Sequence, residues 1–141
     1  MAEQKPSGRE WQTATQLIRG GLARSRFDET CEGLFLTSGY VYGSAEEAER
    51  AFTGEDDRFV YSRYANPTVA MFEQRLAMLE GVDFCKATSS GMAAVFAAMA
   101  CFVNAGDRVV ASKALFGSCR FVVAEILPRF GIESVFVDGT D

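Results

Sequence analysis

Tyr61 and Arg63 have side chains whose types and spacing suit the binding of an anion. Residues 58–64 are rich in aromatic and β-branched types, which predicts an extended chain. Side chains alternate in an extended chain, so the phenol and the guanidinium are expected on one face. A guanidinium matches a phosphate or carboxylate with two parallel hydrogen bonds. The pair therefore suits an oxyanion clamp, although an exposed Tyr and Arg on an edge strand would show the same spacing.

A second candidate anion site is the stretch Thr88-Ser89-Ser90-Gly91-Met92. A short strand is predicted over 83–87 and a helix over 92–103, so these small residues fall on a strand-to-helix turn. The start of a helix offers free N–H groups and a partial positive charge, which attract phosphate. Gly91 lacks a Cβ and lets the backbone approach the anion closely. An ordinary N-cap followed by a glycine is the alternative explanation.

Phe116 lies in a loop between another predicted strand, 108–111, and another predicted helix, 116–127. Ligands of open α/β sheets bind beyond the carboxyl ends of the strands, where this loop and the 88–92 turn are both expected. If the two strands are neighbours, the ring of Phe116 can stack on a flat ligand whose phosphate binds at 88–92. A place in the core is the alternative for this phenylalanine. Lys113, in the same loop, is predicted to be solvated.

The helix predicted between the two candidate sites has both of its ends marked in the sequence. Asn66 suits the N-cap, Pro67 suits the first helical position, and Gly81 suits the C-terminal stop. Apolar residues recur at helical spacing and predict the buried stripe, which consists of Val69, Phe72, Leu76 and Leu79.

The chain before this helix is predicted to contain less regular structure. A tail is predicted over 1–11, a short helix over 13–26, an extended stretch over 34–42 and a helix over 44–52. Ser44 and Glu47 have the spacing of a capping box at the start of the last of these helices. No continuous hydrophobic periodicity runs through this half, so it is predicted to fold poorly alone.

The second half of the chain alternates predicted strands and helices, with a third strand over 132–137. This alternation predicts the α/β class, with parallel β-α-β units and right-handed crossovers. The helix over 92–103 is apolar nearly all round and is therefore expected to be buried on several sides.

Composition limits the class of protein. The chain has the length of one domain, 141 residues, and 48% of them are hydrophobic, which is enough for a core. A net charge of −5 argues against a nucleic-acid partner. No apolar run long enough for a membrane span is present, and the N-terminus has no apolar stretch typical of a secretory signal. Four cysteines without C-x-x-C spacing predict reduced thiols in a cytoplasmic protein. The absence of histidine excludes a His-based triad, and no metal site is predicted.

Two segments in this order, YSRYANPT at 61–68 and ATSSGMAAV at 87–95, resemble the Cys/Met-metabolism family of pyridoxal-phosphate (PLP) enzymes. The resemblance covers about 15–141, and the Y-S-R-x-x-N-P-T string is highly specific. It implies pyridoxal 5'-phosphate as cofactor and the start of a fold type I, aspartate aminotransferase-like major domain over 65–141. It also implies that residues 1–64 form an arm that contacts a neighbouring subunit, in a homotetramer built from dimers.

The resemblance also implies roles for individual residues. Tyr61 and Arg63 match the ligands that this family offers to the phosphate of the neighbouring subunit's cofactor. Gly91 and Met92 match the backbone N–H donors to the phosphate, with Ser90 beside them. Phe116 falls where many relatives have a tyrosine stacked on the pyridine ring. Phenylalanine can stack but cannot move a proton, which disfavours a lyase in which that tyrosine is an acid or base.

The family's Schiff-base lysine lies in a Ser-x-Thr-Lys context that Lys5, Lys86 and Lys113 do not share. The resemblance implies that this lysine lies beyond Asp141, so no catalytic residue is assigned within the chain. The 141 residues are accordingly expected to be an N-terminal fragment without turnover of its own.

Within the family, two features resemble the members that use O-succinylhomoserine and sulfide to form homocysteine for methionine biosynthesis. These features are SGYVYGSAEEAERAFTGE at 38–55 and the phenylalanine of ALFGS at 114–118. A cystathionine γ-synthase or γ-lyase is the alternative within the family, and a non-catalytic assembly module is the alternative outside it. A nicotinamide-binding Rossmann domain is disfavoured because no G-x-G-x-x-G follows a predicted strand.

Overall fold

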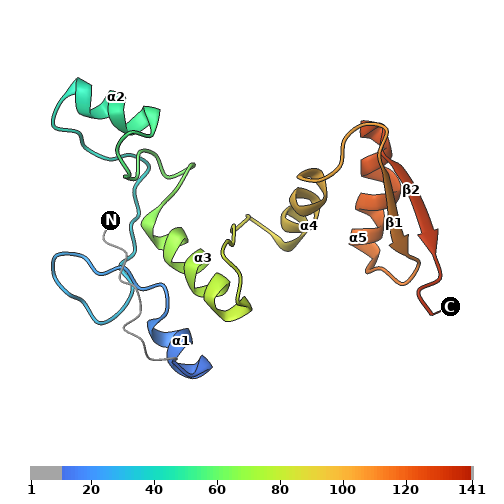
Figure 1. Cartoon of the computed structure of the whole chain (residues 1–141), viewed down its shortest axis with the longest axis horizontal. Coiled ribbons are helices and arrows are strands. Elements are labelled where there is room, and N and C mark those ends of the chain that lie inside the picture. The colour runs from blue at the N-terminus through green and yellow to red at the C-terminus, as the bar shows by residue number, and fades with distance from the viewer. Residues whose placement is uncertain (1–10, 141) are drawn as a thin grey trace. The chain divides into compact units, whose positions relative to one another are not determined.

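The computed structural model describes residues 11–140, which divide into two compact units between Ala87 and Thr88. Within this range the first unit contains three helices (Figure 1): α1, Thr13–Arg19; α2, Ala45–Thr53; and α3, Pro67–Glu80. The second unit contains α4, Gly91–Ala100; β1, Arg108–Ser112; α5, Gly117–Phe121; a π-helical segment, Val122–Ile126; a 3-10 turn, Leu127–Phe130; and β2, Glu133–Val137. The predicted functional boundary after residue 64 lies inside the first unit and stays a prediction.

Helix α3 forms as predicted, and residue type explains both of its ends. The side-chain oxygen of Asn66 accepts a hydrogen bond from the backbone N–H of Thr68 at 2.9 Å. Pro67 occupies the first helical position, where its missing N–H is not needed. Gly81 ends the helix in the left-handed conformation at φ 66°, which glycine adopts without strain.

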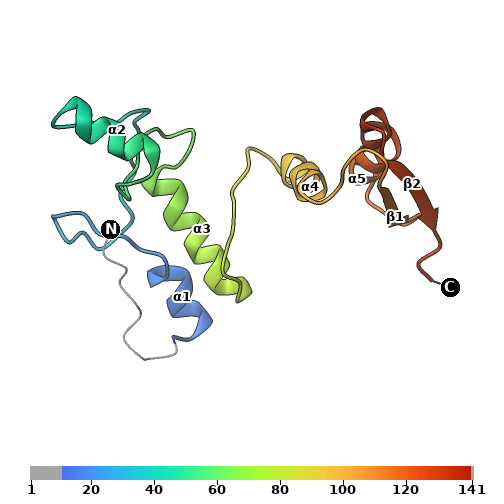
Figure 2. The same ribbon diagram turned by 45° about the horizontal axis from the view of Figure 1, so that its top comes forward.

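The most buried residues of α3 are not those of the predicted stripe, of which Leu76 and Leu79 are half-buried. Val69 and Phe72 are 42% and 56% exposed, whereas Met71 and Ala77 are buried. Helix α1 lies beside α3 (Figures 1 and 2), and the turn that follows α1 comes very close to α3. A Cβ on Gly21, whose φ is +68°, would lie 2.7 Å from the Met71 carbonyl oxygen. Contact with α1 therefore decides which face of α3 is covered. The helical spacing of apolar residues alone does not predict that contact.

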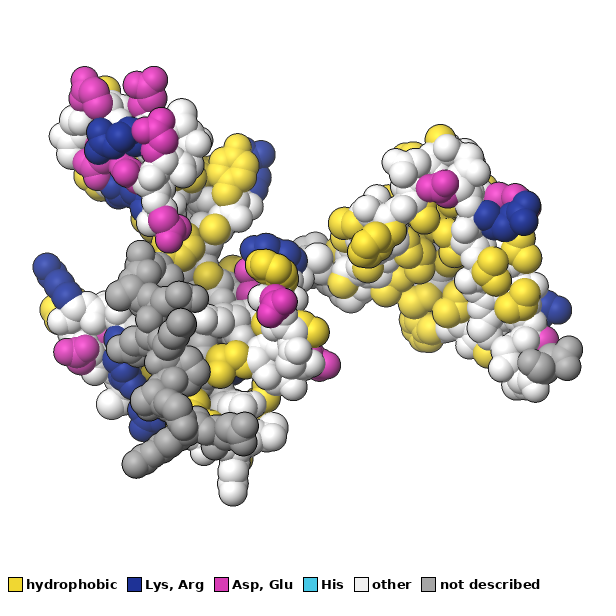
Figure 3. Space-filling model, in the orientation of Figure 1, with side chains coloured by type: hydrophobic (Ala, Val, Ile, Leu, Met, Phe, Trp, Pro, Cys, Tyr) yellow, Lys and Arg dark blue, Asp and Glu magenta, His cyan; other side chains and the backbone are white. Residues whose placement is uncertain are grey.

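Helix α2 begins at the predicted capping residues, Ser44 and Glu47. The hydroxyl of Ser44 accepts from the backbone N–H of Glu47 at 3.2 Å. The Glu47 carboxylate reaches back to the N–H of Gly43 at 2.6 Å, one residue further than in an ordinary capping box, and also pairs with Arg58. Acidic side chains gather over this helix in Figure 3. Glu47 thus joins the start of α2 to the segment that precedes Tyr61.

Glu47 is expected to titrate below the ordinary range of a glutamate. The Gly43 N–H is the largest cause of its lowered pKa, Arg58 lowers it further, and desolvation opposes both. Because the pKa of Glu47 is lower in the folded state than in the unfolded state, its carboxylate stabilises the fold at pH values above the unfolded pKa, which is near 4.5. This stabilisation is lost as the pH falls through the folded-state pKa. A carboxyl-detected NMR titration should place the midpoint below 4.5, and Arg58→Gln should raise it. A midpoint that Arg58→Gln leaves unmoved would contradict the assigned partner.

The stretch predicted to be extended over 34–42 pairs with the segment before α3 rather than forming a regular strand. Gly39 and Tyr61 form an isolated antiparallel pair. The rings of Tyr40 and Phe59 stack with centroids 6.0 Å apart, and the Tyr42 hydroxyl donates to the Val60 carbonyl at 3.2 Å. Several apolar side chains of the stretch point to solvent, among them Leu34, Leu36 and Val41.

The strand predicted over 83–87 is wrong. The backbone N–H of Ala87 donates to the carboxylate of Glu73 at 2.8 Å, and Phe84 is 87% exposed. A strand needs a neighbouring strand to take up its N–H and C=O groups. Within residues 11–140 the sheet consists of β1 and β2, which both lie in the other unit.

The second unit contains the parallel β-α-β arrangement that the sequence predicts. Strands β1 and β2 pair in parallel, from Arg108 opposite Glu133 to Ser112 opposite Val137. The crossover helix begins as α5, continues through the π-helical segment and the 3-10 turn, and ends at Gly131 in the left-handed conformation. Four buried side chains form the core between this crossover and the sheet, namely Val122, Val123, Leu127 and Ile132.

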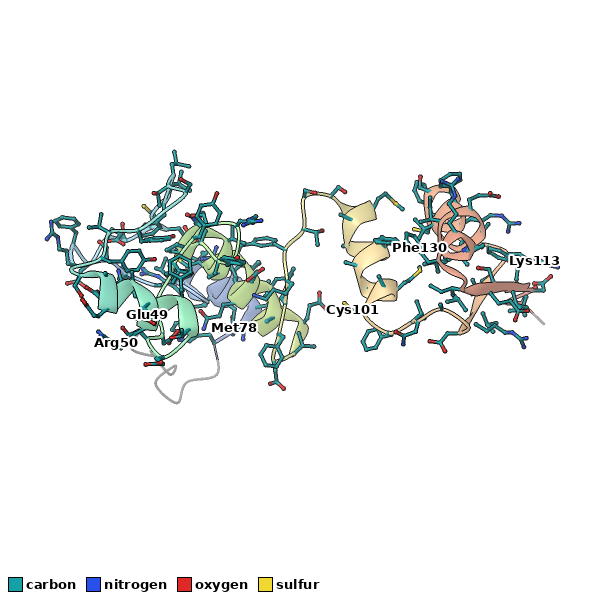
Figure 4. All side chains as sticks on the ribbon, turned by 90° about the horizontal axis from the view of Figure 1, so that it is seen from above. Glu49, Arg50, Met78, Cys101, Lys113 and Phe130 are labelled. Atoms are coloured by element: carbon teal, nitrogen blue, oxygen red, sulfur yellow. The ribbon has the colours of Figure 1, made fainter. Side chains whose placement is uncertain are left out.

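Helix α4 is less buried than its apolar composition predicts. Met92, Phe96 and Met99 pack against the core of the second unit, but no residue of α4 is fully buried. The ring of Phe130, labelled in Figure 4, lies 6.3 Å from that of Phe96. Hydrophobic side chains remain visible over α4 in Figure 3, because the described elements of this unit cover only the face that meets the core.

Candidate functional site

Tyr61 and Arg63 lie together, but a turn brings them together rather than an extended chain. The N–H of Tyr64 donates to the Tyr61 carbonyl at 2.9 Å, which closes a turn over the two intervening residues. The prediction that 58–64 is extended is therefore wrong beyond Tyr61. The chain must change direction between its pairing with Gly39 and the start of α3, and a four-residue turn does this in the available length.

The guanidinium of Arg63 lies against two aromatic rings. Its Cζ is 5.5 Å from the ring centroid of Tyr61 and 5.3 Å from that of Tyr64. The two rings meet edge to face, with centroids 6.3 Å apart. Such contacts favour a cation over an aromatic face. No carboxylate of residues 11–140 forms an ion pair with Arg63, so its hydrogen-bonding edge can accept an external anion.

Three further polar residues of the 61–68 segment fasten this turn to the chain around residue 36, and sequence reasoning missed this role. The amide nitrogen of Asn66 donates to the Phe35 carbonyl and to the Ser62 hydroxyl, both at 2.9 Å. The hydroxyl of Ser62 donates to the Thr37 carbonyl at 2.5 Å. The hydroxyl of Thr68 accepts from the Phe35 N–H at 2.9 Å. The available signal was Asn66 itself, because a capping asparagine has two donors that the cap does not use.

The second candidate anion site lies at the start of α4. Ser90 is the N-cap, and its hydroxyl accepts from the Ala93 N–H at 3.1 Å. The N–H groups of Gly91 and Met92 precede the first intrahelical hydrogen bond, so the helix itself offers them no acceptor. A Cβ on Gly91 would meet no atom within 4 Å, which shows open space at this point. Ser90 therefore caps the helix, and the N–H groups of Gly91 and Met92 remain available as donors beside it.

Phe116 is exposed rather than part of the core. It stands at the N-cap position of α5, at the end of the loop that follows β1, and is 73% exposed. Because β1 and β2 are parallel, this loop lies at the carboxyl edge of the sheet. In Figure 1, α4 begins at the side of this unit toward which both strands run. Lys113 is exposed as predicted, and Figure 4 shows its side chain at the outer end of the sheet.

Each of the two units by itself offers groups that suit part of a ligand, either its anionic group or a flat ring. The second unit offers two backbone donors at a helix start and an exposed aromatic ring, and the first unit offers a guanidinium with a phenol. Within residues 11–140, no group of three or more acidic or cysteine side chains could hold a metal ion. None of the helices in this range is long and apolar enough to cross a bilayer. The guanidinium of Arg63 and the free N–H groups at the start of α4 are hydrogen-bond donors, and the chemistry that such groups support is the binding and orientation of an anion.

The chain is similar in sequence and in fold to known proteins. A family model described as "Cys/Met metabolism PLP-dependent enzyme" matches residues 14–141. O-succinylhomoserine sulfhydrylase of Mycobacterium tuberculosis is 59% identical over 128 residues, which are 91% of this chain and 32% of that protein. The enzyme of the same name from Pseudomonas aeruginosa is 43% identical over 119 residues, 84% of this chain and 30% of that protein.

A solved structure shares the fold of nearly the whole chain. It is a putative O-acetylhomoserine (thiol)-lyase from Campylobacter jejuni that contains N'-pyridoxyl-lysine-5'-monophosphate. Its TM-score is 0.86 at 28% identity, and the match covers 94% of this chain and 32% of that one. The chain thus spans about a third of the length of the relatives that it matches.

Proposed function

Because this chain belongs to the Cys/Met-metabolism family of PLP-dependent enzymes, we propose that it is part of a transferase that makes L-homocysteine. The substrates would be O-succinyl-L-homoserine and sulfide, and succinate would leave as the C–O bond breaks and the C–S bond forms. The observation that supports this choice is the 59% identity, over 91% of the chain, to a protein named O-succinylhomoserine sulfhydrylase. The fold type I architecture is the one seen in the solved relatives.

The residues of the chain would bind and orient the cofactor. PLP, when bound, supplies an electron sink for the substrate's carbon skeleton. Arg63 would hold the phosphate of a neighbouring subunit's cofactor with its guanidinium fork, and Tyr61 would donate its phenol to that same phosphate. The N–H groups of Gly91 and Met92, capped by Ser90, would donate to the phosphate from the start of α4. The ring of Phe116 would stack on the pyridine and exclude water from that face.

Phe116 supports a sulfhydrylase over a lyase. Its side chain has no hydroxyl, so it cannot take or return a proton during the reaction. Its exposed ring is nevertheless free to stack on a planar group. A cystathionine γ-synthase or γ-lyase is the alternative that the substrate experiment below separates from the sulfhydrylase.

We further propose that the protein is a cytoplasmic homo-oligomer. Support comes from the large apolar side chains that the first unit leaves exposed, since surfaces of this kind mark contacts between proteins. Examples are Leu34, Leu36, Val41 and Phe72. In this arrangement residues 1–64 act as the arm on a neighbouring subunit, and Tyr61 and Arg63 serve that subunit's cofactor.

The proposed activity is tested by crossing two esters with two thiols. The protein expressed from the complete reading frame and loaded with PLP is given O-succinyl- or O-acetyl-homoserine with sulfide or cysteine. Homocysteine should form fastest from the succinyl ester with sulfide, while the 141-residue chain alone should form none. Cystathionine formed from cysteine would support the synthase, and release of a keto acid would support the lyase. No homocysteine from either ester would overturn the proposal.

A further inference from the structure

We propose that the side chains of Ser62, Asn66 and Thr68 form a latch that positions Arg63 for its anion. The latch fastens the turn of residues 61–64 to the segment 35–38. The three residues do not themselves contact the anion; they are positioning residues that act through Arg63 and Tyr61. The inference rests on the proposed role of Arg63, and the experiment below separates a failure of the latch from a failure of that role.

Asn66 is the centre of the latch, and the contacts fix the orientation of its amide. Its oxygen accepts from the Thr68 N–H, and its nitrogen donates to the Phe35 carbonyl and the Ser62 hydroxyl. The opposite orientation would set the amide nitrogen against an N–H and the amide oxygen against a carbonyl. Asn66 is only 7% exposed, so these groups must be satisfied within the protein.

Ser62 connects the latch to the anion-binding residues because it lies between Tyr61 and Arg63 in the turn. Its hydroxyl accepts from Asn66 and donates to the Thr37 carbonyl at 2.5 Å. Its backbone N–H donates to the Ser38 carbonyl at 2.9 Å. The hydroxyl and the backbone N–H of Ser62 are therefore both held in place. A shift of this residue would move its neighbours Tyr61 and Arg63.

Polar contacts help to hold the segment 35–38 in the first unit, where Phe35 is its half-buried apolar residue. Within the segment, the side chain of Leu36 is 94% exposed. Leu34, just before the segment, is 73% exposed, so neither leucine contributes much buried apolar surface. Phe35 is instead held at both its N–H and its carbonyl, by Thr68 and Asn66. The side chain of Arg63 is itself exposed and lies against the tyrosine rings of the same turn. Its direction therefore follows from how firmly the turn is held.

The rival explanation is that Asn66 serves only as the N-cap of α3, and Asn66→Asp separates the two roles. Aspartate is an equally good N-cap, because a carboxylate oxygen accepts from the Thr68 N–H. A carboxylate has no N–H to donate to the Phe35 carbonyl or to the Ser62 hydroxyl. Ser62→Ala removes the contacts of the hydroxyl with Asn66 and with the Thr37 carbonyl and leaves the cap untouched. Ser44→Ala, which removes the cap of α2, is the matched control for the loss of a capping contact.

The experiment measures the dissociation constant of PLP by equilibrium dialysis and amide hydrogen exchange in the complete, PLP-loaded protein. Asn66→Asp and Ser62→Ala should each weaken PLP binding on the order of tenfold, because the guanidinium is displaced rather than removed. Exchange at the Phe35 and Ser62 amides should rise, while exchange at Ala70, whose N–H bonds to the Asn66 carbonyl inside α3, should not. Ser44→Ala should change neither quantity. If Asn66→Asp does not fold, Ser62→Ala decides.

A double-mutant cycle distinguishes positioning from a general loss of stability. In an Arg63→Ala background, Ser62→Ala should cost little further PLP affinity, because the residue it positions is gone. An equal loss in both backgrounds would overturn the latch, as would faster exchange at the Ser62 amide with unchanged PLP affinity. If Arg63→Ala alone leaves PLP affinity unchanged, the proposed role of Arg63 fails instead, and the inference fails with it.

Discussion

Replacing Arg63 with alanine is expected to weaken PLP binding by the complete protein by about 30- to 150-fold. The substitution removes a charge-assisted contact with the phosphate, and hydrogen bonds to charged groups contribute about 2 to 3 kcal/mol. The guanidinium has no carboxylate partner within residues 11–140, so little compensating interaction is lost in the free protein. Equilibrium dialysis followed by the absorbance of the retained cofactor measures the effect directly.

Two further variants identify the source of the effect. Arg26→Ala is the matched control, because Arg26 also lies over an exposed aromatic ring, with its Cζ 4.8 Å from the Phe27 centroid, but belongs to no candidate site. It should leave PLP affinity unchanged. Arg63→Lys keeps the charge without the planar fork and should fall between the wild type and Arg63→Ala. Equal cofactor retention by all four proteins would rule out Arg63 as a phosphate ligand.

Replacing Leu127 with alanine is expected to destabilise the second unit by about 2 to 5 kcal/mol, the range for a buried leucine that leaves a cavity. Leu127 is 1% exposed and lies in the core with Val122, Val123 and Ile132. A loss of this size is a large fraction of the stability of an ordinary domain, which is about 5 to 15 kcal/mol. Urea unfolding monitored by circular dichroism should show the midpoint move to a lower urea concentration.

Leu36→Ala is the control for this experiment, because it makes the same chemical change at a side chain that is 94% exposed. Its effect should stay within about 0.5 kcal/mol, as for surface substitutions in general. A similar midpoint shift for both variants would show that Leu127 does not hold the core together.

The sequence predicts best those features that depend on neighbouring residues. Asn66, Pro67 and Gly81 mark the ends of α3 because capping and left-handed conformations are properties of single residue types. Ser44 and Ser90 cap α2 and α4 for the same reason. The parallel pairing of β1 with β2 follows from the order of strands and helices.

The features that the sequence does not predict depend on which segments meet. Val69 and Phe72 have helical spacing, but the contact of α1 with the other side of α3 leaves them exposed. Residues 83–87 have strand-like composition without a strand beside them. Alternation in an extended chain predicted that Tyr61 and Arg63 share a face, and the structure brings them together by a turn. The prediction that Tyr61 and Arg63 lie together is therefore correct, but the physical reason for it is a turn and not side-chain alternation.

The exposed stretch LFLTSGYVY at 34–42 has a consequence for handling the chain in solution. It has no charged residue and no proline, and it is rich in types that favour strands, which is the signature of segments that aggregate as stacked β-sheets. Its backbone forms one isolated pair, between Gly39 and Tyr61, and no strand of residues 11–140 covers its edge, although Ser62, Asn66 and Thr68 bond to several of its backbone groups. The free chain should therefore lose solubility steeply with rising concentration, and a lysine at Leu36 or Val41 should act as a gatekeeper that delays this loss.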